Sequence, residues 1–463
     1  MTRYVSLNPA TGQERARFPE ATQAQIDETL VRSAASRTAL LDMGVAGRAA
    51  ALMRVAAMYR DRSQELGELI ALEMGKPIGQ AVWEAEHCAD IYSYYASEGP
   101  SYIADEPMQR PYGGGSGVIR TEAIGPLLGI MPWNFPYYQV ARFAGPNLLI
   151  GNPILLKHSL ICGGSAAVME EIFQAAGFPE FAYQNLYATH DQVGQMIHDE
   201  RVRGISLTGS ERAGARVAAQ AGQALKKVVL ELGGSDAFVV LEDADVTAAA
   251  AAAARGRFGN AGQSCTSSKR IIVVDEIYDA FVAALEGEIR ELQVGDPLDP
   301  ANGVGPLSSA SARAEIAEQV SDARERGAHV RIGGEELPGG GFFYAPTLIT
   351  DVPEDARIFR EEVFGPVAVV YRAQSEADAI RRANDSDFGL GGSVFSTDAV
   401  RAHRVAEQLE TGMVWINSEP ASAIDGPFGG VKRSGTGREL GRFGLAEFSV
   451  KKLIRNLSDF SPA

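Results

Sequence analysis

Helical periodicity dominates the first hundred residues of the chain. Apolar side chains recur every three or four positions between residues 24 and 62, among them Leu30, Leu41 and Leu52, and charged residues stand between them. A further helix is predicted from about residue 81 to residue 96, before Pro100. The chain is therefore expected to open with a helical region.

Short apolar runs then alternate with helical segments. Strands are predicted at 127–131, 153–156, 204–208 and 227–231, with helices after Pro136, over 163–176 and after Ser210. Buried parallel strands are continuously apolar and are joined by helical crossovers, so this pattern indicates a doubly wound α/β unit. Ligands of such units bind at the C-terminal ends of the strands.

A second α/β series follows Gly234. It begins with a strand near 236–240 and an Ala-rich helix over 246–257, and it continues through strands at 271–274 and 413–417. No internal repeat or long linker interrupts the series. We therefore expect two closely packed α/β domains, with the main boundary just after Gly234.

A hairpin is predicted between the helical region and the first α/β series. Two short strands, at 108–112 and 118–122, flank a Gly-rich turn. Such a hairpin could project from the body of the protein.

Size and charge narrow the class of protein. The chain has 463 residues, more than one hydrophobic core usually organises, and is 45% hydrophobic and 22% charged, as in globular enzymes. Its formal net charge of -16 opposes binding to the phosphates of nucleic acids or to anionic lipid. We therefore expect neither nucleic acid nor a membrane as a partner.

Targeting and metal signals are also missing from the sequence. Residues 1–9 show no basic start followed by an apolar core, so we expect no signal peptide and a cytoplasmic location. The most apolar region, 124–156, is interrupted by prolines, asparagines and an arginine, which argues against a membrane span. Cys88, Cys162 and Cys265 are widely spaced and odd in number, which argues against a disulfide framework and a metal cluster.

Two residues suggest nucleophilic catalysis. Cys265 ends the glycine-bearing segment FGNAGQSC (258–265), which could present a thiol in a cleft; the alternative is an inert buried thiol. Glu231 ends an apolar strand in LELGG (230–234); the alternative is a solvated charge at the strand end. A carboxylate near a thiol can take its proton or activate the water that releases an acyl group.

Two further segments would complete such a site. Asn134, in PWNFP (132–136), follows a predicted strand, and its amide could donate to an oxyanion; the alternative is a turn asparagine. The segment TGSERAG (208–214) is a strand-to-helix turn whose backbone N–H groups could approach a pyrophosphate. It is not the usual G-x-G-x-x-G pattern, and glycine spacing alone is weak evidence.

Together these segments resemble the aldehyde dehydrogenase superfamily, and most closely its succinate-semialdehyde dehydrogenase branch. They occur in the family's order from NPATG (8–12) to PFGGVK (427–432), so the resemblance covers nearly the whole chain. It implies an α/β fold with a Rossmann-type cofactor domain, an α/β catalytic domain and a β-hairpin oligomerisation arm. The implied ranges are 1–105 with 125–234 for the cofactor domain, 235–433 for the catalytic domain, and 106–124 with 434–463 for the arm and C-terminal segment. The arm implies a homodimer or homotetramer.

The resemblance also implies a role for each site residue. Cys265 would be the nucleophile, Glu231 the general base, and Asn134 with the Cys265 backbone N–H the oxyanion hole. Lys157 would bind the adenosine ribose, Gly209 and Ser210 would lie by the pyrophosphate, and Glu362 and Phe364 would hold the nicotinamide ribose. The remaining implied contacts are Trp133, Ser159 and Gly214 for the cofactor and Arg142, Ser264 and Thr266 for the substrate.

The implied reaction is NAD(P)⁺-dependent oxidation of an aldehyde to its acid through a thiohemiacetal and a thioester on Cys265. Succinate semialdehyde is the expected substrate, because Arg142 stands eight residues after Asn134, where enzymes of this branch carry an arginine for the far carboxylate. The alternative for Arg142 is a surface or helix-capping arginine. A broad-specificity aliphatic or aromatic aldehyde dehydrogenase is the second reading.

Other reaction classes fit the motifs less well. Coenzyme A-acylating relatives typically lack the base at the position of Glu231. A thiol hydrolase or a catalytically silent relative would leave the cofactor segments without a purpose.

Three positions depart from the branch's pattern. Gly259 stands where better-studied members have a second arginine, and Ala423 where they have a serine, so we expect Ser422 or Arg438 to substitute. Leu160 stands where enzymes strict for NAD⁺ often carry a glutamate. Without that carboxylate a 2′-phosphate would not be repelled, so we expect both NAD⁺ and NADP⁺ to be used.

Overall fold

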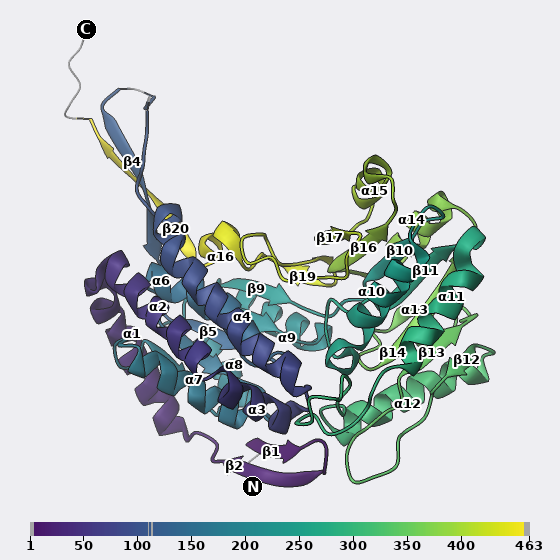
Figure 1. The fold of residues 1–463 in the computed structure, drawn as a ribbon. Coiled ribbons are helices and arrows are strands. Elements are labelled where there is room, and N and C mark those ends of the chain that lie inside the picture. The colour runs from purple at the N-terminus through teal and green to yellow at the C-terminus, as the bar shows by residue number, and fades with distance from the viewer. Residues whose placement is uncertain (1–3, 110, 113, 458–463) are drawn as a thin grey trace.

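The computed structural model describes residues 4–109, 111–112 and 114–457, and these residues form two α/β lobes and an extended arm (Figure 1). The N-terminal half lies mainly in one lobe, and the region from β10 (Ala237–Val240) to β17 (Met413–Ile416) forms the other. No helix within the described ranges is long and apolar enough to cross a membrane.

Helices make up most of the first hundred residues, as predicted. A hairpin of β1 (Tyr4–Asn8) and β2 (Gln13–Phe18) is followed by α1 (Gln23–Asp42), α2 (Gly44–Asp61), α3 (Ser63–Met74), α4 (Ile78–Ser97) and α5 (Gly99–Tyr102). Thr22 begins α1 with a capping box, in which its side chain and that of Gln25 each accept a backbone N–H from the other residue. The apolar faces of α2 and α4 meet in one core, which includes Leu52 and Tyr92.

A six-stranded sheet forms the centre of the first lobe, and it confirms the predicted α/β unit. Its order is β19-β9-β8-β5-β6-β7, and all neighbouring strands run parallel except β19 and β9. The strands are β5 (Leu127–Ile130), β6 (Ile154–Lys157), β7 (Tyr183–Asn185), β8 (Gly204–Thr208), β9 (Lys227–Glu231) and β19 (Gly435–Thr436). The helices of this part are α6 (Tyr138–Ile150), α7 (Gly163–Ala175), α8 (His190–His198) and α9 (Glu211–Gln223).

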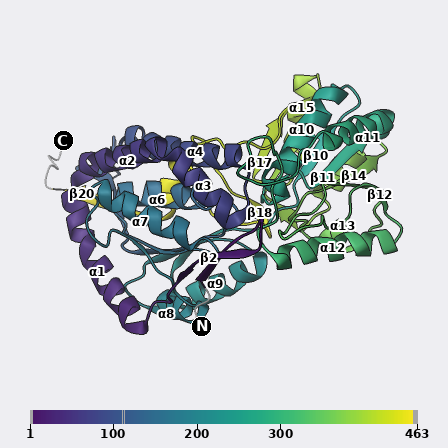
Figure 2. The same ribbon diagram turned by 60° about the horizontal axis from the view of Figure 1, so that its bottom comes forward.

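A seven-stranded sheet of order β12-β13-β14-β11-β10-β16-β17 forms the centre of the second lobe. The strands are β10 (Ala237–Val240), β11 (Arg270–Val274), β12 (His329–Ile332), β13 (Thr347–Thr350), β14 (Val367–Ala373), β16 (Gly391–Phe395) and β17 (Met413–Ile416). The helical segments are α10 (Val246–Phe258), the 3₁₀ turn η1 (Gly259–Gly262), α11 (Asp275–Arg290), α12 (Ala310–Glu325), α13 (Arg357–Arg360), α14 (Glu376–Asn384) and α15 (Ala399–Ala406). Figure 2 shows α10 and α11 side by side on this lobe, whose core includes Phe238 and Val273.

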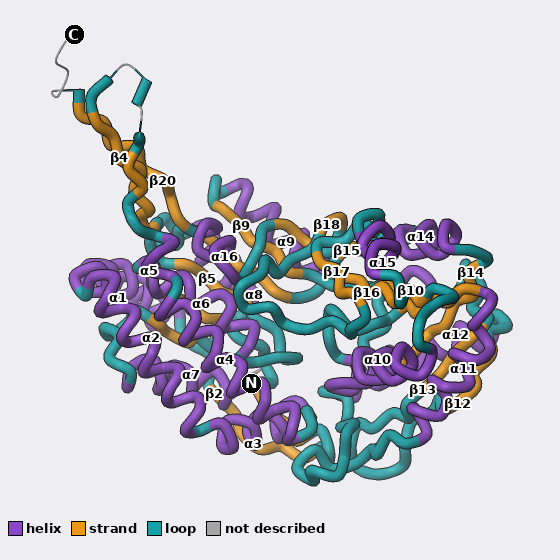
Figure 3. Tube along the Cα trace, turned by 45° about the horizontal axis from the view of Figure 1, so that its top comes forward, coloured by secondary structure: helices purple, strands orange, loops and turns teal. Residues whose placement is uncertain are grey.

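The arm combines two distant parts of the chain. β4 (Ser116–Ala123) pairs antiparallel with β20 (Ser449–Asn456), which follows α16 (Gly441–Glu447), and the two strands run together away from the lobes (Figure 3). A two-stranded sheet of β15 (Phe388–Gly389) and β18 (Val431–Lys432) lies before α16 in the chain.

The predicted position of the first hairpin strand, 108–112, is wrong. That strand is β3 (Glu106–Pro107), which is two residues long and pairs with β4. Pairing continues only to the Met108 N–H, which donates to the Gly117 carbonyl at 2.9 Å, and Pro111 has no backbone N–H that could extend the ladder. Arg110, also in the predicted strand, lies outside the described residues.

Candidate active site

The C-terminal ends of four parallel strands meet at one edge of the six-stranded sheet. Ile130 at the end of β5 pairs with Lys157 of β6 and Leu207 of β8, and Thr208 of β8 pairs with Glu231 of β9. The loops that follow these strands carry residues 132–136, 158–159, 209–210 and 232–234. Parallel pairing thus brings together segments that are up to 100 residues apart in the sequence.

The loop before Cys265 has an unusual backbone. After α10, Asn260 and Ala261 both have a φ of 52°, in the left-handed region. Such a conformation costs an L-residue about 1–2 kcal/mol. The side-chain amide of Asn260 offsets part of this cost, because it donates to the carbonyl oxygens of Asn134 (2.9 Å) and Gln263 (3.2 Å). These bonds also tie the Asn134 loop to the Cys265 loop.

Arg257, at the end of α10, holds the same loop from the other side. Its side chain is fully buried and donates to the hydroxyl of Ser267 (2.6 Å) and to the carbonyls of Val363 (2.8 Å) and Gly365 (2.6 Å). Burial lowers the pKa of Arg257 to about 9, and the charge of Glu362 acts in the opposite direction. Through Arg257 the Cys265 loop is fixed to the segment that contains Glu362 and Phe364.

Cys265 is partly exposed between two cavities. Two cavities, one of about 610 Å³ and one of about 920 Å³, both have Cys265 and Gln139 in their walls. They are named the substrate-side cavity and the cofactor-side cavity after the predicted residues that each contains. Burial raises the pKa of the Cys265 thiol to about 11, and the nearby cations Arg142 and Lys269 act in the opposite direction. The carbonyl of Cys265 packs on Gly234, where a Cβ atom would lie 2.5 Å from that oxygen, so this position requires glycine.

Asn134 lies beside the nucleophile loop and is buried. Its Nδ2 donates to the carbonyl of Gln263 at 3.1 Å. Its Oδ1 has no hydrogen-bond partner within the described ranges. The amide nitrogen carries two N–H groups, so Nδ2 can keep its bond to the Gln263 carbonyl and donate its second N–H to an oxyanion.

Glu231 lies in the wall of the cofactor-side cavity and is only 2% exposed. Neither of its carboxyl oxygens has a hydrogen-bond partner among the residues that the structure describes. Burial, and then the neighbouring Glu439, raise the pKa of Glu231 well above its ordinary value, whereas Arg142 acts against this rise. A carboxylate with a raised pKa is a stronger base, as water activation requires.

Arg142 contributes to the substrate-side cavity, but its side chain has no exposed surface. Its Nε lies 2.7 Å from Oε2 of Glu439, and its guanidinium lies 3.9 Å from the ring centre of Phe428 and 4.7 Å from that of Tyr138. Nη1 has no hydrogen-bond partner in the described part of the chain. This cation is thus held in place, with one donor group still available.

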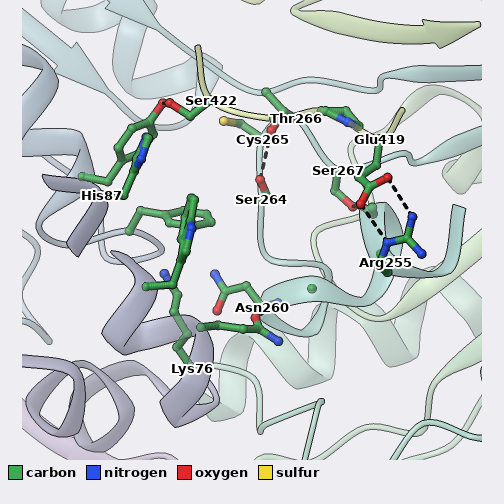
Figure 4. Close-up of a pocket in the computed structure, with 18 of the residues that line it drawn as sticks. Lys76, His87, Arg255, Asn260, Ser264, Cys265, Thr266, Ser267, Glu419 and Ser422 are labelled. Carbon is green, nitrogen blue, oxygen red and sulfur yellow. Dashed lines mark hydrogen bonds and ion pairs between the residues drawn. The ribbon is translucent and has the colours of Figure 1, made fainter. Parts of the chain in front are cut away.

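The other predicted substrate residues lie in the same cavity (Figure 4). Ser264 and Thr266 flank Cys265, and their hydroxyls are 3.3 Å apart. Ser422 faces the cavity and its hydroxyl lies 2.9 Å from that of Tyr138. Arg438, the alternative to Ser422, is not in the cavity wall, and its Nη1 donates to the carbonyls of Gly430 and Gly437.

The cofactor-side cavity contains five of the eight predicted cofactor residues, which are Trp133, Gly209, Ser210, Glu362 and Phe364. The rings of Trp133 and Phe364 meet edge-to-face at 5.8 Å. Ser210 is the N-cap of α9, and Glu211 and Arg212 of the first turn of α9 also line this cavity. The N–H groups at the start of α9 are therefore next to the cavity. The wall of this cavity does not include Lys157, Ser159 and Gly214. Gly214 instead allows α9 to pack on Leu232, because a Cβ atom at position 214 would lie 2.6 Å from the Leu232 side chain.

A dinucleotide fits these groups. Lys157 is 6% exposed and makes no ion pair within the described ranges, and burial lowers its pKa to about 8. A buried ammonium without an ion-pair partner in the described ranges is suited to hydroxyl and phosphate oxygens. No cluster of three or more histidine, cysteine or acidic side chains in the described part of the chain could hold a metal ion.

Sequence patterns did not identify three of the residues just described. Glu439 pairs with Arg142 from 297 positions away, and Arg257 and Lys269 act through backbone carbonyls. Their only sequence signal is a charged residue in a loop or at a helix end, which is too common to identify a site.

The chain is similar to known proteins over nearly its whole length. A protein-family sequence model, described as "Aldehyde dehydrogenase family", matches residues 2–454 of this chain. A succinate-semialdehyde dehydrogenase [NADP(+)] of Deinococcus radiodurans is 48% identical over 98% of this chain and 94% of its own length. The succinate semialdehyde dehydrogenase [NAD(P)+] Sad of Escherichia coli is 42% identical over 96% of both chains. The crystal structure of succinic semialdehyde dehydrogenase from Streptococcus pyogenes in complex with NADP+ is 40% identical, covers 98% of this chain and 99% of its own, and superposes with a TM-score of 0.95.

Proposed function

Because the chain belongs to the aldehyde dehydrogenase family, and so oxidises aldehydes with NAD(P)⁺, we propose that it converts succinate semialdehyde to succinate through a thiohemiacetal and a thioester on Cys265. One observation carries this proposal: Cys265 is shared by two cavities, with the predicted substrate residues in one and most predicted cofactor residues in the other.

The chain's own groups support each chemical step. Cys265 forms a bond to the aldehyde carbon, and Arg142 and Lys269 favour its thiolate. The Asn134 amide and the Cys265 N–H stabilise the oxyanion, each donor contributing about 3–4 kcal/mol in comparable sites. The residues of the cofactor-side cavity would hold a nicotinamide, which would supply the acceptor for the hydride that leaves the substrate carbon. Glu231 then takes a proton from the water that hydrolyses the thioester.

For the cofactor, we propose that Trp133, Gly209, Ser210, Glu362 and Phe364 bind the dinucleotide inside the cavity, with Lys157, Ser159 and Gly214 at its edge. NADP⁺ is accepted because the adenosine-ribose end offers the unpaired Lys157 cation, and Leu160 supplies no opposing carboxylate. Relatives named for NADP(+) and NAD(P)+ support this choice.

The cofactor choice can be tested by adding a carboxylate. Both cofactors should support turnover of the unaltered protein, and Leu160→Glu should reduce kcat/KM for NADP⁺ relative to NAD⁺ by about tenfold, through like-charge repulsion worth about 1.4 kcal/mol. Leu160→Gln, which has the same shape without the charge, should leave that ratio unchanged. Steady-state titration with each cofactor measures it, and an unaltered protein that is wholly inactive with NADP⁺ would refute the proposal.

For the substrate, we propose that Nη1 of Arg142, with the hydroxyls of Ser422 and Tyr138, receives the far carboxylate. Support comes from their common cavity and from the unpartnered donor on Arg142. A second candidate is a broad-specificity aldehyde dehydrogenase. The cavity of about 610 Å³, with Trp83, Phe135 and Trp415 in its walls, favours that candidate because it exceeds the needs of a four-carbon substrate.

Succinate semialdehyde and butyraldehyde distinguish the two candidates. A carboxylate clamp should give the semialdehyde a kcat/KM about 10–100 times higher, since a hydrogen bond to a charged group contributes about 1.5–3 kcal/mol. Arg142→Ala should remove this preference, and Ser422→Ala should weaken it. Butyraldehyde is the internal control, because damage from an unpaired Glu439 would slow both substrates equally. Equal rates for the two aldehydes in the unaltered protein would favour the broad-specificity enzyme.

We further propose that the arm, residues 106–124 with 434–463, joins copies of this chain into a homodimer or homotetramer, and that 1–105 with 125–234 and 235–433 are the cofactor and catalytic domains. β20 is an edge strand of its sheet, and its apolar Leu453 is 58% exposed. Exposed strand edges generally need covering. Light scattering, which gives the mass of the particle in solution, tests the assembly; a monomer would contradict it.

A further inference from the structure

Lys269 is a buried cation directly behind the nucleophile. It lies four residues after Cys265, just before β11, and is 1% exposed. Its Nζ donates to the carbonyl oxygens of Ser264 (2.8 Å) and Cys265 (2.7 Å), and it lies 3.2 Å from Oε1 of Glu362. Two hydrogen bonds and one ion pair thus hold this ammonium group. The cation is therefore fixed between the nucleophile loop and Glu362.

Glu362 lies between this cation and the cofactor-side cavity. It is one of the residues in that cavity wall, and its Oε1 also accepts the backbone N–H of Gly234 at 3.0 Å. The fit is close, because a Cβ at Gly233 would lie 2.4 Å from Oε2 of Glu362. The carboxylate thus touches both the cavity and the cation that holds the Cys265 backbone.

We propose that Lys269 is a positioning residue that links Glu362 to Cys265, so that contacts made by Glu362 inside the cofactor-side cavity change the reactivity of the thiol. The inference rests on the proposed function, in which Glu362 holds the nicotinamide ribose. When Glu362 turns to hydroxyl groups in the cavity, Lys269 keeps its bonds to the Ser264 and Cys265 carbonyls. Less of its positive charge is then neutralised by Glu362, and more of its field acts at the sulfur.

The electrostatics of the thiol have the signs that this link requires. Burial raises the pKa of Cys265, Arg142 and Lys269 lower it, and Glu362 raises it. Moving the Glu362 carboxylate away from Lys269 therefore favours the thiolate. If Lys269 only satisfied two buried carbonyls, the reactivity of the thiol would not depend on what fills the cofactor-side cavity.

Alkylation by iodoacetamide at a single pH measures that reactivity without turnover. Cys88 and Cys162 are fully buried, so the label reports on Cys265. The probe in the cavity is 2′-phospho-ADP-ribose, which carries the ribose but neither the nicotinamide ring nor its charge. Saturation is followed by quenching of tryptophan fluorescence, since Trp133 is in the cavity wall.

In the unaltered protein, the saturating probe should accelerate alkylation at least threefold. Lys269→Met and Glu362→Gln should each bring the ratio of rates with and without probe close to one, and Lys269→Arg should keep part of the effect. Lys226→Met is the matched control, because Lys226 also donates to a backbone carbonyl, that of Asp199, but lies outside both cavities. It should behave as the unaltered protein does.

A ratio of one in the unaltered protein, or an undiminished ratio in Lys269→Met, overturns the link. Glu362→Gln and Lys269→Arg answer the same question if Lys269→Met does not fold. The proposed function fails separately, through absence of NAD(P)H formation with succinate semialdehyde, and the alkylation ratio does not depend on that result.

Discussion

Cys265→Ala should reduce NAD(P)H formation by about 10⁴-fold or more, the loss expected when an enzyme loses its only nucleophile. No other thiol can replace it, because Cys88 and Cys162 are fully buried and lie in neither cavity wall. The fold should survive, because Cys265 is partly exposed and alanine leaves little empty volume.

The loss should be confined to chemistry. Absorbance of NAD(P)H measures the rate, and tryptophan fluorescence should show that the Cys265→Ala protein still binds the dinucleotide. Cys88→Ala is the matched control: it removes a buried thiol of α4 from the core and should retain most of the activity at some cost in thermal stability. Full activity of Cys265→Ala would show that the proposed mechanism is wrong.

Glu231→Gln should separate the two halves of the reaction. If Glu231 activates water, the first turnover should be nearly normal and later turnovers about 10²–10⁴-fold slower, the usual contribution of a general base. Stopped-flow absorbance should show a burst of about one NAD(P)H per active site. Mass spectrometry of the quenched protein should find a succinyl group on Cys265. The burst itself is the control, because it requires an intact fold and nucleophile.

The pH dependence has a defined sign. Burial and Glu439 raise the pKa of Glu231. Glu231 can take a proton from water only as a carboxylate, so thioester hydrolysis should become faster as the pH rises through that pKa. Glu231→Gln should lose this rise. If the Glu231→Gln protein shows no burst, Glu231 instead deprotonates the thiol. If its turnover is unchanged, Glu231 has no role in the mechanism.

Secondary structure was predictable where the apolar pattern is continuous. Residues 204–208 and 227–231 were predicted as strands and are β8 and β9, because each crosses a buried sheet whose parallel neighbours require apolar side chains. The hairpin strand at 108–112 was misplaced, because β4 takes most of its pairing from β20, more than 300 residues later. Local patterns contain no information about such a partner.

The candidate site also has features that the sequence predicted and features that only the structure shows. The sequence by itself predicted Asn134, Glu231 and Cys265 as site residues, because their segments, each weak evidence alone, occur together in the order of the family. Only the tertiary structure decided what surrounds them. It pairs Arg142 with Glu439, leaves both Glu231 oxygens without a partner in the described residues, and places Lys269 between Cys265 and Glu362. The physical reason is that charge, burial and hydrogen bonding depend on distance in space, and these partners come from segments that lie far apart in the sequence and meet only in the folded chain.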